Sequence, residues 1–408
     1  MTNRVGILGG GQLGLLLAQS LIRLGCEVAV YDPDVDAPAC KQTSFAFNGS
    51  WIDNEKLNEF FSSCDLVTYE FENVETDLLF ALQKLKPLYP AAEVLFTTQN
   101  RGREKTFLKE SGLPYPKFAV VPKGSDLASV VGEFRLPCIA KTTFGGYDGK
   151  GQFFLDSQER LQELVDKVDK NPVELILEEV VSLDKEVSCI VGRSKDGKEI
   201  VFPVFENHHR DHILDVTLLP ASVPLLVQEK VRELAKAAAE KLNVVGLLTV
   251  EFFLTQQKPQ SDFAIQVNDW YILINEFAPR PHNSGHITMK ACDLSQFDVL
   301  ARVLLDVPLP EPQMASDAAY CMGNLLGDLW LDQRKNSSAS SHSRHLSLAK
   351  LEDFPEIIDV VDYGKKEPRA KRKMGHFIAK AEDAETLMKV AERFRFELGI
   401  DGGCCSHD

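Results

Sequence analysis

The amino-acid sequence predicts an α/β protein of about three domains, because 408 residues are too many for one hydrophobic core. The chain opens with an apolar strand, a glycine-rich turn and an apolar helix, the pattern of a Rossmann-like βαβ unit. The middle of the chain combines many strands with few helices around a second glycine-rich loop, which indicates an α+β domain. The last part indicates a small β-rich C-terminal domain.

The first domain is expected at residues 1–97. Its predicted elements are a buried strand, a helix that Gly25 ends, and two further strands: strand 4–8, helix 12–24, strand 27–31 and strand 66–69. The last of these strands leads into an acidic turn at 70–73.

The second domain is expected at 98–312, with a lid subdomain at about 117–182, and the third at 313–408. The elements predicted for the second domain are helix 101–111, strands 117–121, 137–142 and 152–155, helix 156–168, strands 173–178, 186–193 and 200–206, helix 225–241, strands 244–254 and 270–276, and helix 294–305. A polar insert at 256–269 is expected to be a surface excursion without a catalytic role. A serine-rich loop is expected at 337–347.

Charge and composition argue against several classes of partner. The net charge of −15 disfavours nucleic acid and anionic membranes, and no apolar run approaches the ~18 residues that span a bilayer. The nine cysteines include no CxxC pair, so neither a zinc site nor a disulfide framework is indicated. We therefore expect a cytoplasmic protein with reduced thiols.

A GxGxxG pattern follows the first predicted strand. Gly9, Gly11 and Gly14 precede a helix, and Asp32 ends the next strand, as in dinucleotide-binding domains. The physical requirement is broader, because glycines let the backbone amides at a helix N-terminus approach any phosphate. The pattern alone leaves three interpretations open, namely NAD, another phosphoester, and simple packing of a strand on a helix.

A second glycine-rich loop, TTFGGYDGKG at 142–151, lies between two predicted strands. Its backbone amides and Lys150 can close over a polyphosphate. Lys141, at the end of the buried strand before the loop, requires an anionic partner. The loop differs from a P-loop because no GK[ST] precedes a helix. A flexible hairpin is the alternative interpretation.

Two glutamates lie within apolar strands, Glu251 in LLTVEFF and Glu276 in YILINEF. If these strands pair, both carboxylates can face one side and share Mg²⁺. Burial of two glutamates without a cation would be costly. The alternative is that one of them faces solvent. Glu178 and Glu179 end another strand, a position suited to contacts with adenine and ribose.

The segment ILINEFAPRPHNSGH, residues 272–286, passes from a buried strand into polar side chains that are costly to bury. Pro279 and Pro281 keep the segment extended. This pattern predicts a binding site, with an ordinary polar loop as the alternative. A basic run at 365–373 can bind phosphate or form a solvated loop, and taken alone it favours the solvated loop.

Together these residues resemble the ATP-grasp superfamily and, within it, the 5-(carboxyamino)imidazole ribonucleotide synthase family. The resemblance covers nearly the whole chain through GQLG (11–14), YEFEN (69–73), REKTFLKESGLP (103–114), GGYDGKGQ (145–152), NHH (207–209), PRPHNSGH (279–286), YGK (363–365) and RKMGH (372–376). GGYDGKGQ and PRPHNSGH are its most specific parts. The chain departs from the family where Leu15 and Leu16 replace a common Arg-Met pair, and where Ala370 and Lys371 replace Pro-Gly.

The resemblance implies an ATP-grasp central domain and a homodimer. It also implies that ATP phosphorylates bicarbonate to carboxyphosphate, which carboxylates the exocyclic amine of 5-aminoimidazole ribonucleotide in purine biosynthesis. ADP and phosphate are released, and the cofactors are ATP and Mg²⁺. Phosphoryl transfer needs mainly positioning and charge neutralisation, which lysines, Mg²⁺ and backbone amides supply. A closing glycine loop would exclude the water that destroys carboxyphosphate.

The resemblance also assigns roles to individual residues. The ATP contacts would be Arg101, Lys141, Gly146, Tyr147, Asp148, Gly149, Lys150, Gly151, Gln152, Glu178, Glu179, Val180, Val181, Glu186, His209, Asn275 and Glu276. Glu251 and Glu276 would bind Mg²⁺. The ribonucleotide would contact Gln12, Leu13, Glu72, Ser284, Arg372 and Lys373. The catalytic residues would be Asp148, Lys150, Asn283 and Lys365, with Asn283 and Ser284 beside the bicarbonate.

Three other functions are considered. A formate-using ATP-grasp enzyme acting on glycinamide ribonucleotide would differ only in the acid that is phosphorylated and in the acceptor. An NAD(P)-dependent oxidoreductase rests on the GxGxxG pattern alone and leaves Lys141 and the paired glutamates unexplained. A nucleotide-binding regulatory module would bind ATP without turnover.

Overall fold

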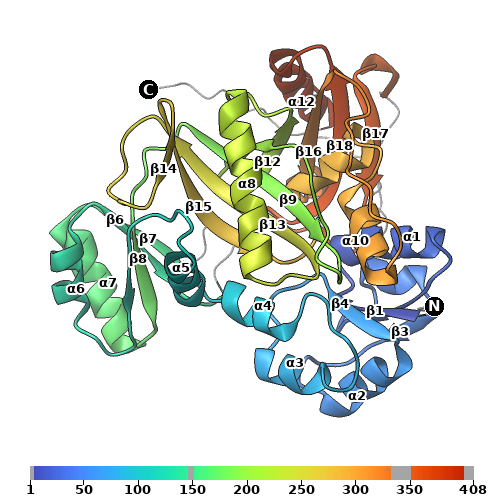
Figure 1. Ribbon diagram of the computed structural model, residues 1–408, viewed down its shortest axis with the longest axis horizontal. Coiled ribbons are helices and arrows are strands. Elements are labelled where there is room, and N and C mark those ends of the chain that lie inside the picture. The colour runs from blue at the N-terminus through green and yellow to red at the C-terminus, as the bar shows by residue number, and fades with distance from the viewer. Residues whose placement is uncertain (1–3, 146–150, 332–350, 399–408) are drawn as a thin grey trace.

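The structure, a computed structural model, describes residues 4–145, 151–331 and 351–398 (Figure 1). The serine-rich loop expected at 337–347 lies outside these residues. The described chain contains two four-stranded sheets and one ten-stranded sheet.

The first domain is a parallel sheet in the order β3-β2-β1-β4, with helices around it. Its elements are β1 (Arg4–Leu8), α1 (Gln12–Arg23), β2 (Glu27–Tyr31), η1 (Pro38–Gln42), β3 (Phe45–Phe47), α2 (Asn54–Ser63), β4 (Leu66–Tyr69), α3 (Thr76–Leu82) and α4 (Ala92–Thr98). The predicted βαβ opening is present. Because the strands are parallel, the turns after β1, β2 and β4 meet at one edge of the sheet.

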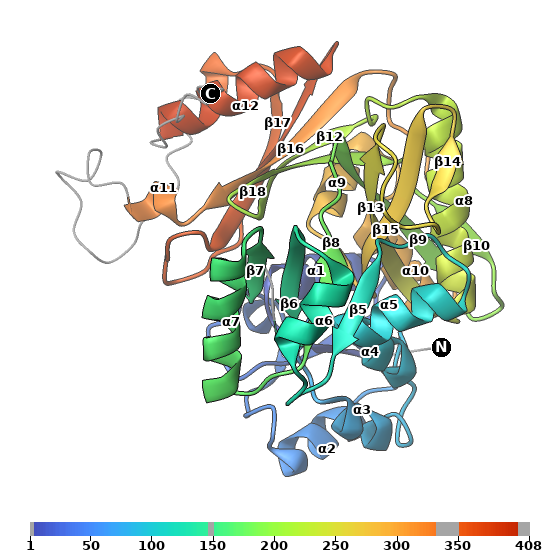
Figure 2. The ribbon, with the colours of Figure 1, turned by 90° about the vertical axis from the view of Figure 1, so that its left-hand side faces the viewer.

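The lid is a second sheet, in the order β5-β8-β6-β7, and it follows helix α5 (Arg101–Glu110). Its elements are β5 (Phe118–Val121), α6 (Leu127–Phe134), β6 (Cys138–Thr142), β7 (Gln152–Leu155), α7 (Gln158–Lys170) and β8 (Leu175–Glu179). Helices α6 and α7 pack on one face and give the lid a core of its own (Figure 2). The sequence did not predict α6, whose valines and Gly132 have low helix propensity. Packing of Leu127, Val131 and Phe134 on the sheet stabilises this helix.

The central sheet has the strand order β14-β15-β13-β9-β11-β12-β16-β18-β17, with β10 paired to β9. The elements of this region are β9 (Lys185–Arg193), β10 (Glu199–Val201), β11 (Phe205–Arg210), β12 (Ile213–Leu219), α8 (Leu225–Lys241), β13 (Gly246–Thr255), β14 (Ile265–Val267), β15 (Trp270–Ala278), η2 (Ser284–Ile287), α9 (Thr288–Ala291), α10 (Gln296–Leu305), β16 (Ala319–Leu326), α11 (Asp328–Leu331), η4 (Leu351–Asp353), β17 (Ile357–Asp362), β18 (Lys373–Ala381) and α12 (Ala384–Leu398). The strand predicted at 200–206 is two strands, because Pro203 cannot donate to the ladder. Strand β12 was not predicted.

The C-terminal strands β16, β17 and β18 extend this central sheet instead of forming a sheet of their own (Figure 1). Alternate side chains of the sheet face different helices. In β9, Val191 faces the core under α8, whereas Ile190 faces the core under α10.

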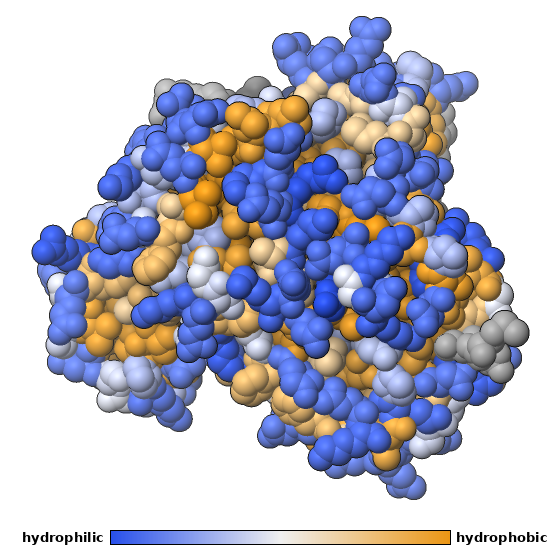
Figure 3. Space-filling model, in the orientation of Figure 1, coloured by the Kyte–Doolittle hydropathy of each residue, from blue (hydrophilic) through white to orange (hydrophobic). Residues whose placement is uncertain are grey.

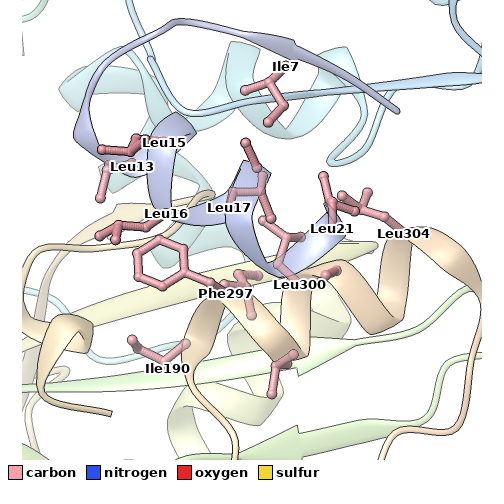
Figure 4. Packing of buried hydrophobic residues seen from close by; sticks show 14 of the residues in the cluster. Ile7, Leu13, Leu15, Leu16, Leu17, Leu21, Ile190, Phe297, Leu300 and Leu304 are labelled. Atoms are coloured by element: carbon pink, nitrogen blue, oxygen red, sulfur yellow. The ribbon is translucent and has the colours of Figure 1, made fainter. Parts of the chain in front are cut away.

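The first domain docks on the central domain through the apolar face of α1. Leu16, Leu17 and Leu21 of this helix share one buried cluster with Phe297 and Leu300 of α10 (Figure 4). This cluster fixes the glycine turn before α1 relative to the central sheet.

The face of the molecule seen in Figure 3 carries both polar and apolar side chains. Figure 3 shows hydrophilic side chains spread over one face, with hydrophobic residues in separate patches. Among residues 4–145, 151–331 and 351–398, each helix is too short or too polar to cross a lipid bilayer. Burial raises the pKa of Cys189 and of Cys321 to about 12, so both thiols stay protonated and unreactive.

We predict that Leu17→Ala lowers the free energy of unfolding by about 2–5 kcal/mol, because a fully buried side chain is lost from the core that α1 shares with α10. Urea unfolding measures the change. Ile22→Ala, on the exposed side of the same helix, is the control and should shift the value by less than about 0.5 kcal/mol. Equal losses in the two variants would contradict this packing.

Candidate active site

The glycine turn between β1 and α1 is occupied by carboxylates of the chain itself. The amides of Gly11 and Gly14 donate to the two carboxylate oxygens of Glu70 at 2.8 and 3.0 Å, and the amide of Gly10 donates to Asp32 at 2.7 Å. A Cβ atom on Gly11 would lie 2.6 Å from Glu70 Oε1, so a side chain there would displace the carboxylate. These amides are the ones that hold pyrophosphate in dinucleotide-binding domains. Because the three amides already have carboxylate partners, the geometry argues against binding of NAD at this turn. It also argues against the interpretation that these amides hold the phosphate of another ligand.

Gln12, the first residue of α1, contacts the C-terminal domain. Lys365, in the loop between β17 and β18, donates from Nζ to Gln12 Oε1 and to the Lys373 carbonyl, both at 2.7 Å. Burial, followed by the charge of Arg372, lowers the pKa of Lys365 to about 8. The side chain of Leu13 packs into the core beside α10, so a ligand contact by Leu13 would use its backbone (Figure 4).

Basic groups gather at the end of β6, ahead of the second glycine loop. Lys141 Nζ lies 2.7 Å from Glu178 Oε2, and both side chains are buried. Burial opposes ionisation of Glu178, but Lys141 outweighs it and the pKa of this carboxyl falls to about 2. Arg101 donates to the Thr142 carbonyl at 2.9 Å. The anion that the sequence required for Lys141 is thus present within the chain.

Part of the predicted ATP loop lies outside the described residues. These predicted contacts are Gly146, Tyr147, Asp148, Gly149 and Lys150. The described ends of the loop are fixed to β6, since the Thr142 amide donates to the Gly151 carbonyl at 2.9 Å and Gln152 pairs with Lys141. The loop therefore begins and ends beside this lysine.

Glu179 is bound to backbone amides. Its carboxylate accepts from Lys117 at 2.7 Å, from Gln260 at 2.6 Å and from Ser261 at 3.1 Å. The insert at 256–269 is therefore fastened to the lid, and Ser261 within it is buried. Most of the insert is exposed, as expected of a surface excursion, but the sequence did not show that its middle caps the end of β8.

Two further predicted ATP residues face each other on neighbouring strands. His209 Nδ1 on β11 lies 3.2 Å from Glu186 Oε2 on β9. Loss of hydration disfavours the charged imidazole, but Glu186 outweighs it, so the pKa of His209 is raised. Val180 and Val181, just after β8, are half-buried.

Strands β13 and β15 pair antiparallel, and Glu251 lies directly opposite Glu276. Glu276 is exposed to solvent, as the alternative interpretation of this pair expected, whereas Glu251 is half-buried. The surrounding protein and then the charge of Glu251 raise the pKa of Glu276 to about 7. Burial opposes ionisation of Glu251, but His282, with Nε2 3.0 Å from its carboxylate, lowers the pKa of Glu251. Two facing carboxylates, one of them resisting ionisation, fit a divalent cation as their neutralising partner.

Any metal bound at this pair needs further ligands. Within the part of the chain that the structure describes, no three His, Cys, Asp or Glu side chains gather closely enough to bind a metal ion by themselves. This donor set suits Mg²⁺, which is commonly bound by one or two carboxylates together with substrate phosphates and water.

The segment 279–286 places polar groups behind the carboxylate pair. His282 Nδ1 lies 2.9 Å from Ser284 Oγ, which in turn lies 2.9 Å from Ser188 Oγ. Ser284 is fully buried in this network. Asn283 is 7% exposed, and among the described residues neither its side-chain nitrogen nor its oxygen has a hydrogen-bond partner. Leaving such a group unsatisfied costs about 1–3 kcal/mol, so Asn283 is a candidate group for binding a ligand.

The same segment contacts the first domain, and the ring of its His286 lies 4.9 Å from the ring of His376, three residues after the basic run. Arg280 Nε lies 2.9 Å from Glu72 Oε1. In the basic run, Arg372 donates to the Glu367 carbonyl at 2.7 Å. The acidic turn at 70–73, the pair of Glu251 and Glu276, and the basic run at 365–373 thus come from three regions far apart in the sequence.

Comparison with known proteins identifies each of these regions. Residues 1–99 match the ribonucleotide synthetase preATP-grasp domain, residues 106–297 the ATP-grasp domain, and residues 321–390 the phosphoribosylaminoimidazole carboxylase C-terminal domain. The N5-carboxyaminoimidazole ribonucleotide synthase of Bacillus subtilis (strain 168) is 35% identical over 404 residues, which cover 98% of this chain and 96% of that protein. The chain belongs to the N5-carboxyaminoimidazole ribonucleotide synthase family.

Solved structures of N5-carboxyaminoimidazole ribonucleotide synthases have the same fold. The Staphylococcus aureus protein complexed with ADP is 31% identical, with a TM-score of 0.83 and 97% of both chains covered. The Aspergillus clavatus protein in complex with ADP and 5-aminoimidazole ribonucleotide is 29% identical, with a TM-score of 0.81, covering 96% of this chain and 99% of that one. The predicted combination of Rossmann-like, ATP-grasp and C-terminal parts is confirmed.

Two residues at this synthase site were not predicted from the sequence. Glu70 shares the YEFEN turn with Glu72, but only the fold shows that its carboxylate reaches the start of α1. His282 was visible as a polar residue after β15, but its contact with Glu251 depends on the path of the chain after that strand.

Proposed function

We infer that this chain is an ATP-dependent carbon–nitrogen ligase that carboxylates 5-aminoimidazole ribonucleotide to 5-(carboxyamino)imidazole ribonucleotide in purine biosynthesis. Bicarbonate is the carboxyl source, and ADP and phosphate are released. The observation that carries this conclusion is the environment of Glu276. Helix α5 binds the Asn275 carbonyl just before Glu276 and, through Arg101, the strand end beside Lys141. Arg280, four residues after Glu276, contacts Glu72 of the first domain, so both ends of the site lie near one carboxylate.

At the nucleotide end, the chain binds ATP. Its phosphates lie near Lys141 and Arg101, and its adenosine lies near Glu178, Glu186 and His209. Glu251 and Glu276 hold Mg²⁺. When bound, this ion neutralises charge on the transferring phosphoryl group. Lys141, held in place by the ionised Glu178, stabilises negative charge on the phosphates.

At the carboxylation end, a bicarbonate oxygen takes the γ-phosphoryl group of ATP and forms carboxyphosphate. The substrate amine then attacks the carboxyl carbon, and the bond from that carbon to the bridging oxygen breaks. Phosphate leaves with the electron pair, and the proton that the amine gives up balances its charge. Asn283 offers one donor and one acceptor to the bicarbonate, both without other partners among the described residues. Lys365 bears a positive charge between the first and third domains. Asp148 and Lys150, outside the described residues, are proposed as catalytic residues on the family resemblance.

Several finer features belong to the same proposal. Domain limits of 1–97, 98–312 and 313–408 are supported by family matches at 1–99, 106–297 and 321–390. Contacts of Gln12, Arg372 and Lys373 with the ribonucleotide rest on the family resemblance and on their position around Lys365. The contact of Glu72 rests on the resemblance alone. A homodimer in the cytoplasm rests on the resemblance alone.

A coupled assay of ADP release tests the function. We expect turnover that requires both bicarbonate and 5-aminoimidazole ribonucleotide, and none with formate and glycinamide ribonucleotide. Turnover with the second pair would assign the chain to the formate-using reaction. A rise in nicotinamide fluorescence at micromolar NADH would instead support the oxidoreductase. That result would contradict the argument from the glycine turn, whose amides are bound by Glu70 and Asp32.

We predict that Glu276→Ala reduces ATP turnover by at least about 100-fold while the fold persists, because one of the two Mg²⁺-binding carboxylates is removed. Turnover is measured at saturating Mg²⁺, and circular dichroism reports folding. Glu110→Ala, which removes an exposed carboxylate at the end of α5, serves as the control and should keep full activity. Wild-type turnover in Glu276→Ala would remove Glu276 from the metal site.

The pKa of Lys365 predicts a pH dependence. Its ammonium form is present below about pH 8 and is lost as the pH rises through that value. If the charged form binds the substrate phosphate, kcat/KM for 5-aminoimidazole ribonucleotide falls about tenfold per pH unit above pH 8. Lys365→Arg, which stays protonated, should remove this decline even if its activity is lower. The same decline in Lys365→Arg would assign the pKa to another group.

A further inference from the structure

Strand β15 contains a β-bulge beside the paired glutamates. Glu251 pairs with Glu276, but the next residue of β13, Phe252, pairs with Ile274, so Asn275 is the extra residue on β15. A bulge leaves the extra residue without its place in the ladder and turns the neighbouring side chains. The backbone around Glu276 therefore needs partners from outside the ladder, and strand β14 does not supply them because it pairs only with residues 270–272.

Two adjacent residues of helix α5 bind this backbone on either side of Glu276. Lys105 donates from Nζ to the Asn275 carbonyl, and Glu104 Oε1 accepts from the Phe277 amide at 2.7 Å. Glu104 is 2% exposed and Lys105 is 1% exposed. The two side chains thus hold the peptide groups that precede and follow the glutamate.

The first turn of α5 binds the strand that carries Lys141. The Arg101 amide donates to the Thr143 carbonyl at 3.0 Å, and its guanidinium donates to the Thr142 carbonyl at 2.9 Å. Arg101 and Lys105 are four residues apart, so they lie on one face of the helix, about one turn or ~5.4 Å from each other. Helix α5 therefore bridges the end of β6 and the bulge of β15.

Stability alone gives a poor account of this arrangement. Burial of a lysine and a glutamate is costly, and apolar residues of similar size are often equally or more stabilising at such positions. Apolar contact between the helix and the strand is already present, since the rings of Phe107 and Phe277 lie 6.2 Å apart. The two polar side chains instead satisfy particular peptide groups next to a proposed metal ligand.

We propose that Glu104 and Lys105 are positioning residues that orient Glu276, and that α5 sets the distance between Lys141 and the paired glutamates. The proposal rests on the proposed function, because it assigns Mg²⁺ to Glu251 and Glu276. It adds two residues that contact neither the nucleotide nor the metal and act through the backbone of β15.

Calorimetric titration with ADP, with and without Mg²⁺, tests Lys105. In the wild type, Mg²⁺ is expected to raise the affinity for ADP. We expect Lys105→Met to reduce this gain about 10- to 100-fold, the usual effect of mutating a residue behind a metal ligand, while the affinity for ADP without Mg²⁺ stays within about twofold. Lys105→Arg keeps a donor and should recover most of the Mg²⁺ effect. Lys109→Met, an exposed position on the same helix, should match the wild type.

A matched pair of substitutions tests Glu104. Glu104→Ala removes the acceptor of the Phe277 amide, whereas Glu104→Gln retains a carbonyl oxygen there. We expect Glu104→Ala to lose the Mg²⁺ effect and Glu104→Gln to retain most of it. The Mg²⁺ concentration for half-maximal ATP turnover should rise in the same order, with KM for 5-aminoimidazole ribonucleotide little changed.

Two results would overturn the proposal. One is a wild-type Mg²⁺ effect in folded Lys105→Met and Glu104→Ala. The other is an equal loss of ADP affinity with and without Mg²⁺, accompanied by a lower melting temperature, which would mark a purely structural role. The binding measurement needs no turnover. A wild-type protein that binds Mg²⁺ and ADP but does not consume ATP with bicarbonate and 5-aminoimidazole ribonucleotide would therefore refute the function and not the positioning role.

Discussion

Two negative charges held face to face are the constraint on which this site depends. Pairing of β13 with β15 places Glu251 opposite Glu276, and like charges at that separation resist simultaneous ionisation. The chain compensates each carboxylate differently. His282 keeps Glu251 ionised, whereas Glu276 has a raised pKa and faces solvent. This imbalance suits the Mg²⁺ ion that we propose between the two carboxylates, near Lys141, the lysine proposed to face the nucleotide phosphates.

The glycine turn after β1 shows how one local pattern can serve a different purpose. In dinucleotide-binding domains its amides bind an external pyrophosphate. Here Glu70 supplies that negative charge internally, so the helix N-terminus is neutralised before any ligand arrives. Gln12, at the start of α1, is then oriented toward Lys365 of the C-terminal domain. A nucleotide-binding pattern has become part of a domain interface.

The arrangement of the domains brings distant residues into one site. The apolar face of α1 fixes the first domain against α10, and the strands of the C-terminal region continue the central sheet. Lys365 therefore lies beside a residue 353 positions earlier in the chain. Residues 105 and 275 are joined in the same way, across the helix and the bulged strand.

The sequence by itself determined the βαβ opening, most strands of the lid and central domain, and the family resemblance that names most site residues. These features follow from side-chain periodicity and from short motifs, which depend on neighbours in the chain. It did not reveal helix α6, strand β12 or the role of the insert that binds Glu179, because packing and contacts between distant segments decide them. Only the tertiary structure decided that Glu70 fills the glycine turn, that Asn283 is buried with its amide unsatisfied among the described residues, and that a bulge at Asn275 lies next to the pair of Glu251 and Glu276. Each of these depends on where a backbone group of one segment meets a side chain of another, and local sequence does not encode that distance.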